Sequence, residues 1–354
     1  METINRSFRS SHERGQNTTT ETQDLIRTDG YVDVEGGRIW YMRVESAQTH
    51  QSAQTRHSQS PQSPQSPQSP ASEGAPASAL TPLIVLHGGP GSSHLGMLPL
   101  QALANERPVI FYDQLGCGHS DRPADKSLWT TQRFVRELAS LRDALGLSKV
   151  HILGHSWGTM LLCDYLLTKP EGVQTAIFSS PCLSAPRWVE DANKYRAALP
   201  KDVQAVLKRC EGDGTTDSDE YEQASDVYTK RHVCRVEVPK EQRDARKWAF
   251  GEEVYHTMWG PSEFHATGTL KTYDRTDRLH EINVPSLFCC GEYDEASPES
   301  TQYYHSLVPQ SQFQVMPGCS HSPLRESPDA YLSMIRTYLN NSDAGSFAAP
   351  SISE

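Results

Sequence analysis

The chain has 354 residues, 36% of them hydrophobic, which suffices for one large domain or for a core domain with a sizeable insertion. Its 44 acidic residues outnumber its 33 lysines and arginines, and the formal net charge is −11. Because the sequence has no basic block, nucleic acid and anionic membranes are not expected as partners.

The chain begins with a polar, aperiodic segment, residues 1–24, which we expect to be a disordered tail. This segment lacks the apolar core of a signal peptide, and no apolar run approaches the roughly 18 residues that a membrane span needs. The eight cysteines are scattered and several lie inside apolar runs, so buried free thiols are expected rather than disulfides. We therefore predict a soluble, cytoplasmic protein.

Two features precede the main part of the chain. Residues 31–46 alternate apolar and polar side chains around Gly36 and Gly37, a pattern typical of a β-hairpin. Residues 47–80 are dominated by Gln, Ser and Pro and contain SPQSPQSPQSP, a repeat too polar to pack. We interpret this low-complexity segment as a solvated insertion between strands, and a proline-rich docking peptide is the alternative.

From residue 82, short apolar runs such as PLIVL, VIFY, KVHIL and SLFCC alternate with helix-length segments. Residues 128–147 are an example, with Leu138, Leu141 and Leu145 on one helical stripe. Strand and helix repeated in this way predict an α/β fold, with a mostly parallel sheet and helices on both faces.

One segment, residues 185–275, interrupts this alternation, because it is charged, helical in pattern and without a clear strand. We predict a helical cap, which would lie over the carboxyl ends of the strands, where ligands bind in open α/β sheets. The core is then predicted to consist of residues 25–184 and 276–340. The last segment, 341–354, is expected to be a second disordered tail.

A Gly-x-Ser-x-Gly motif, Gly154 to Gly158, lies directly after KVHIL and directly before a helical pattern. On a sharp strand-to-helix turn both glycines are needed, because side chains there would collide with neighbouring backbone. The turn would expose the Ser156 hydroxyl at a helix N-terminus, where developing negative charge is favoured. We predict Ser156 as the nucleophile of a serine hydrolase.

The loop LHGGPGSS, residues 86–93, follows an earlier buried strand, where this architecture needs a backbone donor for an oxyanion. Two preorganised N–H groups there are worth several kcal/mol of barrier in ester or amide hydrolysis. We assign the oxyanion hole to the backbone amides of Gly89 and Trp157.

A serine nucleophile needs a base, and the base needs an acid that orients it, in the chain order Ser, Asp or Glu, His. His321 follows the last apolar run and precedes a final helical pattern, so we predict it as the base. Asp294 ends the turn after SLFCC and is the predicted acid, with room for one helix and one strand before His321. Other downstream histidines, including His232, are expected to be surface or packing residues.

Six motifs in chain order, HGGPG, DQLGCGHSDRP, GHSWG, MWGPSEF, GEYDE and GCSHSP, cover about residues 81–325. Together they resemble the α/β-hydrolase proline iminopeptidases and their relatives, which include tricorn-interacting aminopeptidases and amino-acid amidases. Thr159 departs from the pattern, because many relatives carry a further glycine there, and the Gln/Ser/Pro insertion has no expected counterpart.

The resemblance implies a serine-protease-type triad of Ser156, Asp294 and His321. It also implies that Glu263 and Glu295 hold the free amino group of a small peptide or an amino-acid amide, and a buried cationic amine does need such carboxylates. Tyr255 and Trp259, with Met258, would line the pocket for the first side chain. A preference for proline follows from the resemblance alone.

No CxxC, HExxH or phosphate-binding loop occurs, and neither a metal nor an organic cofactor is expected. Two other functions remain open. A hydrolase or acyltransferase could use the same scaffold on an ester or amide of a small natural product that lacks a free amine. A binding protein could have kept the fold without catalysis. The oligomeric state has no signal in the sequence.

Overall fold

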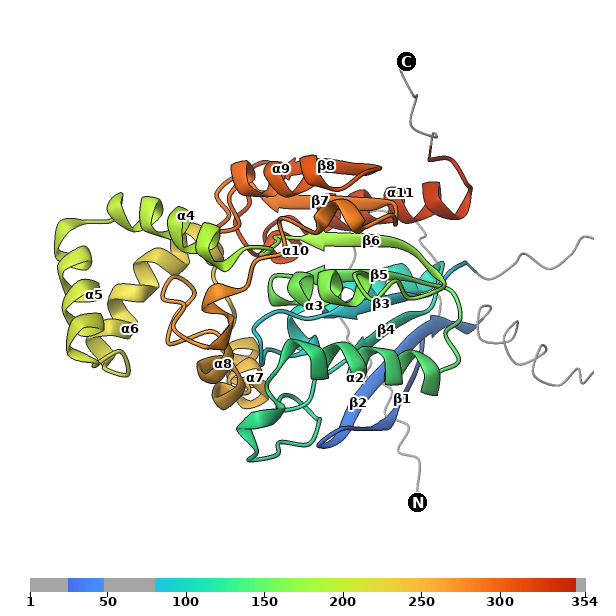
Figure 1. Ribbon diagram of the computed structural model, residues 1–354, viewed down its shortest axis with the longest axis horizontal. Coiled ribbons are helices and arrows are strands. Elements are labelled where there is room, and N and C mark those ends of the chain that lie inside the picture. Colours follow the sequence, from blue (N-terminus) through green and yellow to red (C-terminus); the bar gives the residue numbers. More distant parts are fainter. Residues whose placement is uncertain (1–24, 48–79, 348–354) are drawn as a thin grey trace, which may run out of the picture.

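An eight-stranded sheet forms the centre of the computed structural model, which describes residues 25–47 and 80–347 (Figure 1). The expected tail 1–24 and nearly all of the 47–80 insertion lie outside the described residues. The strands are β1 Leu25–Val34, β2 Gly37–Ser46, β3 Leu83–Leu86, β4 Val109–Tyr112, β5 Val150–His155, β6 Val173–Ser179, β7 Ser286–Gly291 and β8 Ser311–Met316.

The strand order is β1-β2-β4-β3-β5-β6-β7-β8. The first two strands form the predicted hairpin, and β2 pairs antiparallel with β4, whereas the six strands from β4 to β8 are parallel. The mostly parallel sheet is thus confirmed. The hairpin begins six residues earlier than expected, because pairing continues outward from the turn until Leu25 meets Ser46.

Burial explains which strands are central. Every residue of β3, β4 and β7 is buried, as expected for strands covered on both faces, while the edge strand β8 alternates between half-buried and exposed positions and buries only Met316. On one face the sheet packs against α2 (Thr131–Ala144), α3 (Trp157–Leu166) and α9 (Pro298–Leu307). On the other face it packs against the 3₁₀ segment Leu98–Asn105 and α11 (Pro328–Asp343).

The helices between β6 and β7 lie together beyond one end of the sheet (Figure 1). They are α4 Ala185–Ala197, α5 Lys201–Asp213, α6 Asp219–Tyr228, α7 Lys240–Ala249 and α8 Glu252–Met258. Ser184 begins α4 as its N-cap and also donates to Asp274 Oδ2 at 2.9 Å, so the two ends of the segment meet at the sheet. We call residues 185–275 the cap, as proposed from the sequence.

The last helix continues past residue 340, where we had placed the start of a tail. Asp343, in its final turn, accepts from Arg107 Nη1 at 2.6 Å and lies 3.2 Å from His151 Nε2. Both partners are buried, so this contact fixes the end of α11 against the sheet. In residues 25–47 and 80–347 no helix is both long and apolar enough to cross a membrane.

Candidate active site

Ser156 lies on the predicted turn between β5 and α3, with φ 55° and ψ −124°. A Cβ at Gly154 would lie 2.3 Å from the carbonyl oxygen of Gly158, and a Cβ at Gly158 would lie 2.4 Å from that of Leu86. Both approaches are too close for a side chain. The two glycines therefore permit the turn that places Ser156 at the N-terminus of α3.

Thr159, the departure noted in the sequence, stabilises this turn. Its hydroxyl donates to the Ser156 carbonyl at 2.6 Å and accepts from the Cys182 amide at 3.0 Å. The Ser156 amide in turn donates to the Ser179 carbonyl at 3.0 Å. The threonine thus connects the start of α3 with the segment that follows β6, a connection that a glycine could not make.

The HGGPG loop lies beside Ser156, and Gly89 has φ +114°. A Cβ on Gly89 would lie 2.6 Å from the amides of Gly91 and Ser92, so only glycine fits. Gln114, after β4, joins this loop to α3, because its amide group donates to the His87 carbonyl at 3.3 Å and accepts from the Trp157 indole at 2.8 Å. Sequence reasoning missed Gln114.

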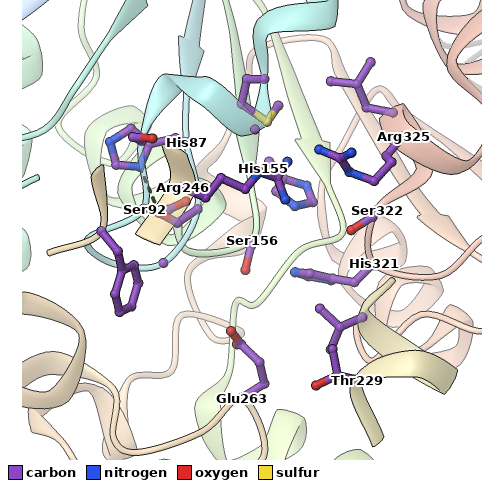
Figure 2. Close-up of a pocket in the computed structure, with 18 of the residues that line it drawn as sticks. His87, Ser92, His155, Ser156, Thr229, Arg246, Glu263, His321, Ser322 and Arg325 are labelled. Carbon is purple, nitrogen blue, oxygen red and sulfur yellow. Dashed lines mark hydrogen bonds between the residues drawn. The ribbon is translucent and has the colours of Figure 1, made fainter. Parts of the chain in front are cut away.

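The acid and base that we predicted are in contact. Asp294 Oδ1 lies 2.7 Å from His321 Nδ1, and both side chains are buried. The other oxygen, Oδ2, accepts from Ser180 Oγ at 2.6 Å and from the Gly291 amide at 3.1 Å, which fixes the carboxylate. Helix α9 and strand β8 separate the two residues in sequence, as expected. Figure 2 shows His321 directed towards Ser156.

Glu295 also faces His321, from the neighbouring position of the same turn. Its Oε1 lies 3.8 Å from His321 Nε2, and neither carboxylate oxygen has a hydrogen-bond partner among the described residues. Burial, together with the carboxylates of Glu263 and Asp294, raises the pKa of Glu295 well above its ordinary value, while His321 and the hydroxyl of Tyr228 act in the opposite direction. Apart from His321, this buried carboxylate has no positively charged partner among the described residues.

Glu263 belongs to the cap and lies on the other side of Ser156 from the HGGPG loop's His87 (Figure 2). Burial raises its pKa, while His321 and the hydroxyl of Tyr255 act in the opposite direction. The structure thus brings Glu263 of the cap and Glu295 of the turn after β7 close to His321, with the Tyr255 hydroxyl beside Glu263.

Burial opposes a charge on His321, yet the surrounding carboxylates outweigh it. Asp294, Glu295 and Glu263 together raise the pKa of His321 to about 9. A ligand that neutralises one of these carboxylates would consequently lower the pKa of His321.

The aromatic residues form the walls of a cavity of about 530 Å³ and of a small recess beside Ser156. Tyr255 lines the cavity, and Trp259 lines the recess together with Trp188 of α4. The indole of Trp188 also meets the His321 ring edge to face, with centroids 5.6 Å apart. Met258, by contrast, is fully buried in the core. Trp188 had no signal in the sequence that distinguished it from other cap aromatics.

His232 connects the cap to both loops of the site. Its carbonyl accepts from the amides of Glu295 at 3.3 Å and His321 at 3.1 Å, and its ring lies 3.0 Å from the Tyr293 carbonyl. The residue belongs to a π-helical turn, Thr229–Val233, that extends α6. Because these contacts use mainly backbone atoms, no side-chain pattern could predict them.

Comparisons with known proteins show the family of the chain. A family model described as alpha/beta hydrolase fold matches residues 81–328. The proline iminopeptidase of Heyndrickxia coagulans is 47% identical over 315 residues, which cover 89% of this chain and 99% of the relative. That of Lactobacillus delbrueckii subsp. lactis is 36% identical over 75% of this chain and 92% of the relative.

Solved structures give the same result. The crystal structure of a proline iminopeptidase from Mycobacterium smegmatis matches with a TM-score of 0.74 and 32% identity over 90% of this chain and 100% of its own. The crystal structure of VinJ matches with a TM-score of 0.77 and 31% identity over 89% of this chain and 98% of its own. The predicted fold class, family resemblance and enzyme class, a hydrolytic peptidase, are confirmed. The chain belongs to the proline iminopeptidases, within the α/β-hydrolase fold.

Proposed function

We propose that the protein is a serine aminopeptidase, which removes an N-terminal proline or another small apolar residue from short peptides or amino-acid amides. The observation that carries this proposal is the buried carboxylate of Glu295, which lies without a hydrogen-bond partner 3.8 Å from His321 Nε2. Such a group fits a substrate whose free amine lies next to the scissile carbonyl.

In the proposed mechanism, Ser156 Oγ attacks the carbonyl carbon while His321 Nε2 takes its proton. The backbone amides of Gly89 and Trp157 stabilise the oxyanion of the tetrahedral intermediate. His321 then gives the proton to the leaving amine, and the C–N bond breaks to leave an acyl-enzyme. Water, deprotonated by His321, releases the N-terminal residue and restores Ser156. Asp294 keeps the imidazole in the tautomer that this requires.

The amine would lie between Glu263 and Glu295. A cation there offsets the cost of burying two carboxylates, and it also reduces their influence on the base. Because those carboxylates help to raise the pKa of His321 to about 9, amine binding lowers that pKa and favours the neutral imidazole that attack needs. The recess lined by Pro90, Trp188 and Trp259 supports a compact apolar first residue.

The amine site predicts selectivity for free N-termini. We expect Glu295→Gln and Glu263→Gln each to lower kcat/KM for prolyl anilide by about 10- to 100-fold, because each removes one charge-assisted contact. Turnover of an amine-free phenyl ester should fall much less. The measurement is steady-state kinetics on both substrates and on N-acetylprolyl anilide.

Glu299→Gln is the matched control, because Glu299 is an exposed acid in the first turn of α9. It should leave the ratio between anilide and ester unchanged. Equal wild-type rates on free and N-acetylated anilides would contradict the amine site and favour the alternative, a hydrolase or acyltransferase for substrates without a free amine.

The same acids predict a change in pH dependence. Removing the Glu295 charge destabilises the imidazolium form of His321, so the pKa of His321 falls and the neutral base persists at lower pH. For the amine-free ester, the acidic limb of kcat/KM should therefore shift by about one pH unit to lower pH in Glu295→Gln. A profile that coincides with that of wild type and Glu299→Gln would show that Glu295 does not act on the base.

We also propose a cytoplasmic location and a small peptide or amino-acid amide as the only partner required for activity. All eight cysteines are free thiols, and all except Cys234 are buried, which supports a reducing compartment.

A further inference from the structure

Two arginines line the active-site cavity on the side of Ser156 away from Glu263 (Figure 2). Arg246 belongs to α7 of the cap, and Arg325 belongs to α10 (Pro323–Glu326), directly after the loop of His321. The mechanism derived above uses neither of them. Their position places two positive charges where the leaving part of a substrate would extend from the scissile bond.

Neither guanidinium forms an ion pair with a carboxylate in residues 25–47 and 80–347. Arg325 donates through Nη1 to Gln242 Oε1 at 2.7 Å, but its Nε is buried without a partner. An arginine usually satisfies its five donors when it is removed from water. Arg246 and Arg325 therefore retain N–H groups that can donate hydrogen bonds to a ligand.

The two charges also act on each other. Burial and, to a smaller extent, the nearby charge of Arg325 lower the pKa of Arg246 to about 10. An ideal Cβ on Gly96 would lie 3.4 Å from Arg246 Nη2, so the side chain reaches across to the wall formed by the 3₁₀ helix His94–Gly96. A doubly hydrogen-bonding anion would relieve the repulsion between the guanidinium groups.

Charge is thus divided around the cavity. Glu263 lines the cavity, and the charges of Glu263 and of the buried Glu295 both act on His321, whereas the charge that acts most on Arg246 is that of Arg325. In Figure 2, Ser156 lies between Glu263 on one side and Arg246 and Arg325 on the other. A short peptide with a free amine at one end and a free carboxylate at the other matches this arrangement.

We propose that Arg246 and Arg325 bind the terminal carboxylate of the leaving residue, so that the preferred substrates are dipeptides and tripeptides with a free C-terminus. This inference rests on the proposed aminopeptidase function and specifies its substrate class. The cavity, of about 530 Å³, has the size of sites that enclose small ligands. Longer peptides would carry their carboxylate beyond the two guanidinium groups.

The test compares prolylglycine with prolylglycinamide, which differ only in the terminal carboxylate, and uses prolyl anilide as an independent substrate. For the wild type we expect kcat/KM to be about tenfold or more higher for the acid than for the amide, mainly through KM. Arg246→Gln and Arg325→Gln should each bring this ratio towards one. Arg246→Lys should restore part of it, because a point charge remains.

Lys240→Gln is the control, since it removes one positive charge from α7 at an exposed position that does not line the cavity. Its acid-to-amide ratio should equal that of the wild type. A wild-type ratio near one, with prolyl anilide still hydrolysed, would overturn the carboxylate site and leave the aminopeptidase function intact. Failure of the wild type to hydrolyse any of the three substrates would instead overturn the proposed function.

Discussion

Ser156→Ala is expected to lower kcat for prolyl anilide by about 10⁶-fold. Without Oγ no acyl-enzyme can form, and what remains is the smaller rate enhancement from binding and from the oxyanion hole. Ser156 is also the expected target of a serine-reactive fluorophosphonate. Steady-state kinetics and mass spectrometry of the labelled protein measure the two effects separately.

The matched control is Ser225→Ala, because Ser225 lines the same cavity and its hydroxyl is buried without a hydrogen-bond partner among the described residues. This variant should still be labelled at Ser156. Labelling that persists in Ser156→Ala, or a loss of only a few-fold in kcat, would show that another group is the nucleophile.

Asp294→Asn should reduce kcat by about 10⁴-fold on every substrate, whether or not it carries a free amine. Asp294 Oδ1 accepts from His321 Nδ1 at 2.7 Å, and a carboxamide that turns its NH₂ towards the ring favours the wrong tautomer. Nε2 would then hold the proton and could not accept another from Ser156. Kinetics on the anilide and the amine-free ester measure the loss.

Glu295→Gln provides the contrast, because it changes the adjacent carboxyl by the same isosteric replacement. It should mainly affect substrates with a free amine, whereas Asp294→Asn should affect all of them alike. Thermal unfolding of both variants separates catalysis from stability, since Asp294 also accepts from Ser180 and the Gly291 amide. Identical substrate profiles for the two variants would contradict the separate roles.

Local sequence constraints explain why part of this site was predictable. The turn at Ser156 requires glycines at fixed positions, and strand and helix patterns flank it directly, so a short stretch of sequence specifies both the geometry and the role. Asp294 and His321 follow from the order of strands in the fold. Asp294 and Glu295 are adjacent in one turn and both lie beside His321, at Nδ1 and at Nε2 respectively, and the sequence alone did not specify this arrangement.

Tertiary packing explains why the rest was not predictable. Trp188, Arg246 and His232 come from cap segments whose helical patterns show which residues are apolar, but not which face points towards Ser156. Gln114 acts through hydrogen bonds to two loops that are distant in sequence. The extra ordered turn at the end of α11 depends on Arg107 and His151, both far along the chain from Asp343.

The carbonyl of His232 links the position of the cap to that of the predicted base. It accepts from the amides of both Glu295 and His321, so a single residue of the cap holds the loop of the base and the turn of the proposed amine site. A substitution that alters the cap backbone at His232 would therefore move both loops together, and it would impair amine binding and proton transfer at the same time.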